Sequence, residues 1–283
     1  MNDSVDNSEK LKEILVALDH SYHSRTALES AALIAQLLQA DIHGIFVRDD
    51  KWLRLSKLPS LIEVDELTGR ISSVGGQMIE QEIRSLERTI RRHFELISRQ
   101  HELSYTWSSA KGVAAEKILE AAKHSDIITI GTRGRSYSKS RSKKIGSTAL
   151  TVLQTAEKPV LILQKSYTPE RSPTVVFDGS KRSVSGLSLA SDIAEKNETN
   201  LTVIDISEAF PFKSQGKTLD EELNTSNDAQ IVTLKQSDMG RFLFLVNRLQ
   251  GGILILPKNK RFTKRNVLEL ILDSAESPVL LAS

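Results

Sequence analysis

The stretch Ile128-Thr129-Ile130-Gly131-Thr132-Arg133-Gly134, followed by Gly146-Ser147-Thr148, decides the fold. An apolar run ends in two glycines, and a new helical pattern then opens on a glycine and a serine. This order is typical of a buried strand that runs into a loop and then into the N-terminus of a helix. Glycines let the backbone approach a ligand closely, and the first N–H groups of a helix lack partners within it. The stretch therefore predicts a site for a phosphate or another anion.

The loop between these glycines carries a concentrated positive charge. It holds six cations and no acidic residue: Arg133, Arg135, Lys139, Arg141, Lys143 and Lys144. Because the formal net charge of the whole chain is only +2, the charge is local and bulk binding of nucleic acid is not expected. Serines alternate with the bases, so contact with an RNA backbone and phosphorylation of the loop stay open beside the simplest interpretation, a solvated loop.

Working outward, apolar runs alternate with helical patterns through the first half of the chain. The expected strands are 14–18, 42–47, 104–108, 127–130 and 159–163, and the expected helices are 24–38, 77–101, 114–124 and 147–156. Such alternation predicts a parallel sheet with helices on both faces. The apolar stripe along 77–101 is expected to face the core of the protein rather than a partner.

The second half of the chain repeats this scheme. Val176-Phe177-Asp178-Gly179-Ser180 stands 159 residues after Ala17-Leu18-Asp19-His20-Ser21, and Ser277-Pro278-Val279-Leu280-Leu281 matches Lys158-Pro159-Val160-Leu161-Ile162. Matches at both ends of each half indicate a duplicated domain. We expect a disordered tail at 1–10, a first domain at 11–165, a linker at 166–173 and a second domain at 174–283. The second domain is expected to be trimmed between its second and third strands.

Composition excludes several classes of function. The chain has no cysteine, which rules out disulfides and thiolate metal sites and suits a reducing compartment. No apolar stretch approaches the roughly 20 residues of a membrane span, and the polar, acidic start differs from a signal peptide. We therefore expect a cytoplasmic protein without a membrane partner. Spacing alone reveals neither a side-chain metal site nor a Ser/His/Asp set, so no catalytic residue is expected.

Taken together, these motifs resemble the universal stress proteins in tandem form, over about 12–165 and 173–283. The resemblance rests on Asp19-His20-Ser21 after the first strand and on closing strands that begin Pro-Val. It also rests on Gly131, Gly134, Gly146 and Ser147, which follow the family's pattern Gly-x2-Gly-x9-Gly-Ser/Thr. The resemblance implies an α/β, Rossmann-like fold that binds adenine nucleotides. It implies two tandem doubly wound parallel sheets, each with five strands in the order 3-2-1-4-5.

The same resemblance implies ATP as the ligand, with Mg²⁺ or Mn²⁺ as its companion. The expected ligand-binding residues, from nucleoside to phosphates, are Ala17, Asp19, Val47, Gly131, Gly134, Gly146, Ser147 and Thr148. The first two would face the nucleoside, the third would meet the adenine through its backbone, and the fourth would lie against the ribose. The remaining four would hold the phosphates. Asp19 has a second interpretation, because aspartate is also a favoured N-cap for the helix that follows.

The chain departs from the family pattern in two places. Eleven residues separate Gly134 from Gly146, where the pattern has nine. In the second domain Pro257 and Arg265 take the places of Gly131 and Gly146, and the connecting loop is seven residues shorter. Proline removes a backbone donor, and a side chain in place of the second glycine would obstruct a phosphate. We expect ATP in the first domain and no nucleotide in the second.

The expected function is a cytosolic stress-response protein that binds ATP for sensing or regulation, without being an enzyme. One alternative is a weak ATPase or a self-phosphorylating protein that uses the serines near Ser147. Another is a nucleotide-free interaction module that holds a different anion or RNA through the basic loop 133–144. The two domains are expected to form an intramolecular pseudo-dimer with their closing strands side by side, which leaves room for a homodimer of two chains.

Overall fold

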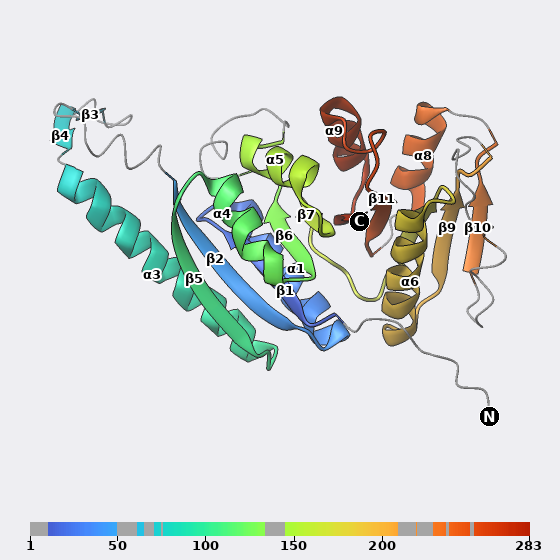
Figure 1. The fold of residues 1–283 in the computed structure, drawn as a ribbon, viewed down its shortest axis with the longest axis horizontal. Helices are drawn as coiled ribbons and strands as arrows, with labels where there is room; N and C mark the ends of the chain where they lie inside the picture. The colour runs from blue at the N-terminus through green and yellow to red at the C-terminus, as the bar shows by residue number, and fades with distance from the viewer. Residues whose placement is uncertain are drawn as a thin grey trace.

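A computed structural model describes residues 11–49, 61–64, 71–74, 76–133, 145–208, 219, 229–235, 238–249 and 252–283. The expected tail at 1–10 and nearly all of the basic loop, including Gly134, lie outside these residues. The described part is a sheet of ten strands with helices on both faces (Figure 1). The first half of the chain, blue to yellow-green, lies on the left of the figure, and the second half, gold to red, lies on the right.

The first half contributes five parallel strands. They are β1 (Glu13–Leu18), β2 (Asp41–Asp49), β5 (Tyr105–Gly112), β6 (Ile127–Gly131) and β7 (Val160–Leu163). They lie in the order β5-β2-β1-β6-β7, which is 3-2-1-4-5 in the count of this half. The expected fold class is confirmed. Because the chain winds outward from β1 in both directions, the switch point of the sheet lies between β1 and β6.

The second half has the same strand order. Its strands are β8 (Thr174–Phe177), β9 (Leu201–Asp205), β10 (Ala229–Thr233), β11 (Leu254–Pro257) and β12 (Val279–Ala282). They lie in the order β10-β9-β8-β11-β12. The segment from the end of β9 to the start of β10 is much shorter than the one from β2 to β5.

The two five-stranded sets join into one continuous sheet of ten strands. Strands β7 and β12 pair antiparallel, with Leu161 opposite Leu280 and Ile162 opposite Val279. The pairing gives each closing strand a neighbour and removes two exposed edges. Beside this junction Lys165 forms an ion pair with Glu276 at 2.9 Å. The two closing strands therefore lie side by side, as expected.

The helices cover the two faces of the sheet. One face carries α1 (Tyr22–Leu38), α3 (Gly76–Gln100) and α6 (Lys181–Lys196), and the other carries α4 (Ala114–Ala121), α5 (Ser147–Thr155), α8 (Met239–Leu249) and α9 (Arg265–Ser274). A 3-10 turn (Ala122–His124) follows α4, and a small antiparallel hairpin, β3 (Leu61–Val64) with β4 (Ile71–Val74), precedes α3. None of the described helices is long and apolar enough to cross a membrane.

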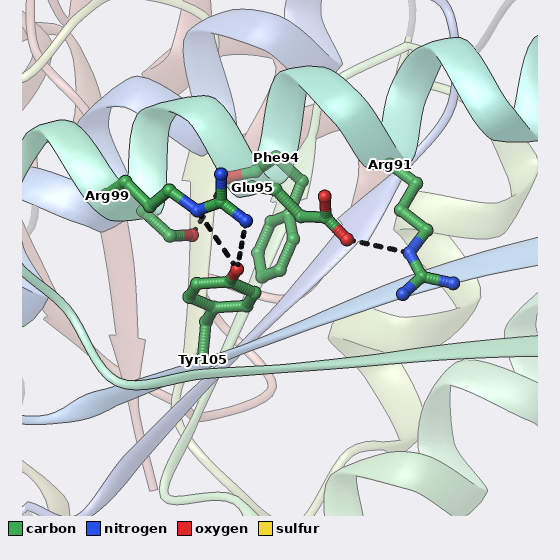
Figure 2. A network of polar contacts seen from close by, with 6 residues as sticks. Arg91, Phe94, Glu95, Arg99 and Tyr105 are labelled. Carbon is green, nitrogen blue, oxygen red and sulfur yellow. Dashed lines mark hydrogen bonds and ion pairs between the residues drawn. The ribbon is translucent and has the colours of Figure 1, made fainter.

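Helix α3 is held on the edge strand β5 by one apolar face. Phe94 is fully buried, and its ring lies 5.8 Å from that of Tyr105 and 5.4 Å from that of Trp107. On the outer side, Arg99 donates two hydrogen bonds to the Tyr105 hydroxyl, and Arg91 donates to Glu95 at 2.8 Å (Figure 2). The stripe expected to face the core does so along most of the helix.

The linker packs against both halves. Tyr167 is 4% exposed, and its backbone N–H donates to the hydroxyl of Ser30 in α1. Its own hydroxyl accepts a hydrogen bond from Asn197, which caps α6, at 2.6 Å. Burial raises the pKa of this tyrosine. A polar, proline-containing sequence thus holds a buried anchor between the halves.

Candidate functional site

A cavity of about 650 Å³ lies at the carboxyl edge of the first half of the sheet. The ends of β1, β2 and β6 form its floor, the first turns of α1, α4 and α5 surround it, and α3 adds an apolar wall. Small-molecule sites commonly have volumes of roughly 300–1,000 Å³. The lining includes seven of the eight predicted site residues: Ala17, Asp19, Val47, Gly131, Gly146, Ser147 and Thr148. The eighth, Gly134, lies outside the described residues.

Asp19 organises the turn between β1 and α1. Its Oδ1 accepts from the backbone N–H of Ser21 at 2.9 Å, and the hydroxyl of Ser21 accepts from the N–H of Ser24 at 3.1 Å. Ser21 is therefore the N-cap of α1, and the interpretation of Asp19 as that cap is wrong. The aspartate stands two residues too early for this role. It fixes the capping serine instead and lines the cavity.

Gly131 is required by the packing of α1. A Cβ at this position would lie 2.8 Å from the backbone carbonyl carbon of His23 and 2.9 Å from its Cβ. Backbone atoms cannot yield as the end of a side chain can, so the end of β6 approaches α1 this closely only with glycine. The sequence assigned this residue to the ribose of a ligand, and that role stays a prediction. The close contact with α1 is a separate reason for glycine at this position, and the spacing of the motif did not reveal it.

The two ends of the basic loop meet at the cavity. The N–H of Gly146 donates to the carbonyl of Thr132 at 2.9 Å, and the N–H of Thr132 donates to that of Leu163 at 3.1 Å. Gly146 is the N-cap of α5 and supplies no side-chain cap, and the first turn holds no acidic residue. The first turn of α5 therefore offers backbone N–H groups and the positive end of the helix dipole beside the cavity.

Cationic and unpartnered polar atoms lie near this end of the basic loop. Arg133 lines the cavity, and its Nε is buried without a hydrogen-bond partner among the described residues. The hydroxyl of Thr132 and the Nδ1 of His23 are buried without one as well. Burial lowers the pKa of His23, the charge of Arg133 lowers it further, and Asp19 opposes both. The imidazole is therefore neutral at pH 7, and a bound anion would supply the acceptor that Arg133 lacks.

Other residues that line the cavity are apolar. Ile83 and Leu86 of α3, Ile45 of β2 and Ile118 of α4 line it. The sequence assigned the α3 stripe wholly to the core, and so missed the part that borders the cavity. It also missed Arg48, which lines the cavity and forms an ion pair with Glu87 at 4.0 Å. Only the docking of α3 brings Ile83 and Leu86 to the site, whereas Arg48 reaches it at the end of β2, directly after the predicted Val47.

A Ser–His–Glu chain, which spacing did not reveal, lies on neighbouring strands. The Nε2 of His43 and the Oγ of Ser108 are 2.7 Å apart, and Nδ1 lies 3.7 Å from Oε1 of Glu13. The second distance exceeds that of a hydrogen bond. Glu13 instead accepts from the hydroxyl of Ser125 at 2.6 Å. None of these residues lines the cavity, so we interpret the chain as a polar contact that holds the strands together.

The second half has the same turn between its first strand and first helix, but the residues around that turn bond to one another. Ser180 caps α6, and its N–H donates to Asp178 at 3.0 Å, as Ser21 does to Asp19. Asp178 is 2% exposed and also accepts from Nδ2 of Asn259. The Oδ1 of Asn259 accepts from the backbone N–H groups of Arg261 and Phe262. The backbone N–H groups of Arg261 and Phe262 are thus occupied by the protein itself.

The described residues contain no group of three or more His, Asp or Glu side chains that could hold a metal ion. A divalent ion at the cavity would therefore need most of its ligands from groups other than clustered carboxylates or imidazoles of the described residues.

The fold and the cavity together define a doubly wound α/β protein with its candidate ligand site at the switch point of the sheet. The family model for the universal stress proteins matches residues 10–164, more than half of the chain. The chain belongs to the universal stress protein family. The matched residues cover the half that contains the cavity.

Solved structures agree with this fold. A universal stress protein from Archaeoglobus fulgidus DSM 4304 is similar with a TM-score of 0.66 and 15% identity, over 96% of this chain and 98% of the other. A functionally unknown protein from Pseudomonas aeruginosa PAO1 has a TM-score of 0.57 and 16% identity, over 96% and 92% of the two chains. At these identities the likeness shows the shared fold, including its tandem arrangement. Comparison with curated proteins finds no match.

Proposed function

We propose that the first half of the chain binds ATP in the 650 Å³ cavity, and that the protein serves the stress response as a nucleotide-dependent sensor or regulator. Family membership supports the stress-response role. The observation that carries the ATP proposal is the meeting of seven predicted ligand residues around one cavity, with the buried Nε of Arg133 lacking a partner among the described residues.

The cavity lining offers groups for both ends of a nucleotide. The apolar residues Ile83, Leu86 and Ile118 can pack against a base, and the backbone of Val47 can bond its edge. The first turn of α5 and Arg133 can hold phosphates, since a helix N-terminus and a guanidinium both favour anions. A divalent ion, when bound, neutralises phosphate charge.

We propose that the second half binds no nucleotide. The self-bonded turn at Asn259 supports this, because it occupies the N–H groups of Arg261 and Phe262. Phe262 is 1% exposed and packs against Phe242, with ring centroids 5.7 Å apart. One nucleotide per chain is therefore expected. The cytoplasmic location remains a prediction.

Calorimetric titration of Mg-ATP into the wild type and Gly146→Arg tests this proposal. The variant places the second half's residue at the N-cap of α5, and we expect binding to fall by at least roughly a hundredfold, since an obstructed phosphate loses several hydrogen bonds. Gly240→Arg is the matched control, because this exposed glycine of α8 does not line the cavity and a Cβ there would meet only the end of the Asp238 side chain, at 3.3 Å. Unchanged affinity in Gly146→Arg would refute the site, and absence of binding to the wild type would refute the function.

The two alternative functions give different results in the same protein. Steady release of phosphate that collapses in Ser147→Ala would identify an ATPase or a self-phosphorylating protein. If the wild type binds RNA and does not bind Mg-ATP, the protein is an interaction module that acts through the basic loop 133–144.

A further inference from the structure

A contact between the two halves reaches the residue that leads into α5. Ile145 directly precedes Gly146 and is 2% exposed. Its backbone N–H donates to Oε1 of Glu269 at 3.2 Å, and its carbonyl accepts from Nη2 of Arg265 at 3.4 Å. Both partners lie in α9, 124 and 120 residues further along the chain. Both polar groups of this peptide position are thus held by the second half.

The two partners also hold each other. Nε of Arg265 donates to Oε1 of Glu269 at 3.0 Å, one helical turn apart on α9. The Glu269 side chain is 23% exposed, so its contacts are partly shielded from water. A charged acceptor forms shorter and stronger hydrogen bonds than a neutral one. Arg265 is half exposed, and the pair forms an attachment point for the backbone of Ile145.

This attachment point sits at the stem of the candidate phosphate loop. Gly146, the next residue, donates to Thr132 and so closes the loop at 2.9 Å. Ser147 and Thr148 follow at once and line the cavity. The position of their backbone N–H groups consequently depends on two adjacent anchors, one within the first half and one supplied by the second.

The first half reaches the segment before α9 through a different residue, since Nε2 of Gln154 donates to the carbonyl of Thr263 at 3.4 Å, and it has no pair equivalent to Arg265 and Glu269. Strands β7 and β12 correspond with an offset of 119 residues, so Arg265 stands where the first half has Gly146, and Glu269 stands where it has Leu150. A leucine side chain accepts no hydrogen bond, so Leu150 cannot hold α9 as Glu269 holds Ile145. Arg265, which stands in place of a glycine, is thus also the residue whose guanidinium reaches the carbonyl of Ile145 in the first half.

We propose that the Arg265–Glu269 pair of the second half positions the phosphate-binding turn of the first half and thereby raises its affinity for the phosphates of the ligand. The proposal rests on the proposed function. It assigns the second half a positioning role at the site, and Arg265 and Glu269 act through Ile145 without touching the ligand.

The test compares Glu269→Ala with two matched variants. Glu269→Gln keeps an oxygen that can accept from Ile145 and Arg265, so it should restore part of the contact. Glu95→Ala breaks an Arg–Glu pair of the same spacing on α3. There Nε of Arg91 donates to Oε1 of Glu95 at 2.8 Å, and neither residue lines the cavity (Figure 2). Hydrogen–deuterium exchange of the peptide 145–153 and titration with ATP and with adenosine are measured for each.

In Glu269→Ala we expect faster exchange at 145–153 and ATP binding weakened roughly tenfold, the scale of one charge-assisted hydrogen bond. Adenosine binding should stay unchanged, because adenosine has no phosphate for the turn to hold. Glu95→Ala should match the wild type, and Glu269→Gln should fall between the wild type and Glu269→Ala, because its neutral oxygen still accepts but forms weaker hydrogen bonds. Equal losses for ATP and adenosine would reveal a general structural effect and overturn the proposal.

Binding of ATP by the wild type with unchanged affinity in Glu269→Ala would overturn this proposal alone and leave the proposed function intact. Absence of ATP binding to the wild type would overturn the proposed function and this positioning role together. The two failures are therefore distinguishable in one set of titrations.

Discussion

Asp19 and Asp178 show how one residue type serves both halves differently. Each accepts a hydrogen bond from the serine that caps the next helix, and each follows the first strand of its half. Their surroundings differ at Asn259, which donates to Asp178 and organises a tight turn beside it. Asp19 borders a cavity instead. The local turn follows from the local sequence, and a distant neighbour decides what the carboxylate faces.

A further residue-scale consequence concerns acid stability at His43. Burial lowers the pKa of His43 below its ordinary 6.5, and Glu13 opposes this shift. The unfolded chain therefore binds the proton more readily, so this stability is present above pH 6.5 and is lost as pH falls through that value toward the folded pKa. His43→Gln carries no such proton, and its stability should fall less than that of the wild type between pH 8 and pH 5.

Urea unfolding of both proteins at several pH values measures this difference. Parallel pH profiles for the wild type and His43→Gln would contradict the assignment of the titration to this histidine.

At the scale of elements, α3 illustrates what periodicity predicts well. The expected helix 77–101 corresponds to the observed Gly76–Gln100, and its apolar stripe packs on the sheet. The residues that meet β5 include Phe94, which lies against two aromatic rings. Docking of α3 also brings Ile83 and Leu86 to the cavity. The stability of this helix therefore bears on the shape of the candidate site.

Phe94→Ala tests the docking of α3. Removing this fully buried ring should lower the free energy of unfolding by about 3–5 kcal/mol, because the cavity left behind adds to the lost transfer energy. Leu96→Ala is the matched control on the same helix, where the side chain is 58% exposed and the expected loss is below about 0.5 kcal/mol. Chemical denaturation measures both. Similar losses in the two variants would contradict the observed face of the helix.

The sequence predicted most elements because their signals are local. The expected strand 127–130 and helix 147–156 differ from the observed Ile127–Gly131 and Ser147–Thr155 by a single residue. Strand β5 extends four residues beyond the expected end, to Gly112, since pairing with β2 supports a stretch that has weak strand periodicity of its own. The sequence of one strand alone does not predict which strand it pairs with or how far the pairing extends.

For the candidate site, the sequence predicted the residues at strand ends and helix starts, since these follow motifs. It did not predict Arg48, the cavity-facing part of α3, or the hold of Glu269 on Ile145. The last pair lies 124 residues apart, and neither residue belongs to a motif. Such contacts depend on how distant elements pack in the folded protein. Local signals in a single sequence do not determine that packing.

At the scale of the molecule, the junction of β7 and β12 makes the two halves one folding unit. The shared sheet, the buried Tyr167 and the ion pair of Lys165 with Glu276 all join them. Calorimetry should therefore show one unfolding transition for the full chain. Leu280→Ala, at a 2% exposed position of β12, should lower the midpoint of that single transition. Two resolved transitions in the wild type would show that the halves unfold independently.

The antiparallel direction of that junction has one more consequence. Strands within each half are parallel, so all five strands of the first half run opposite to those of the second. Their carboxyl ends point to opposite rims of the sheet. A duplicated pocket on opposite rims can diverge at one rim while the other keeps its ligand. In this geometry, the proposed loss of a phosphate site in the second half and its proposed support of the first half can coexist in one chain.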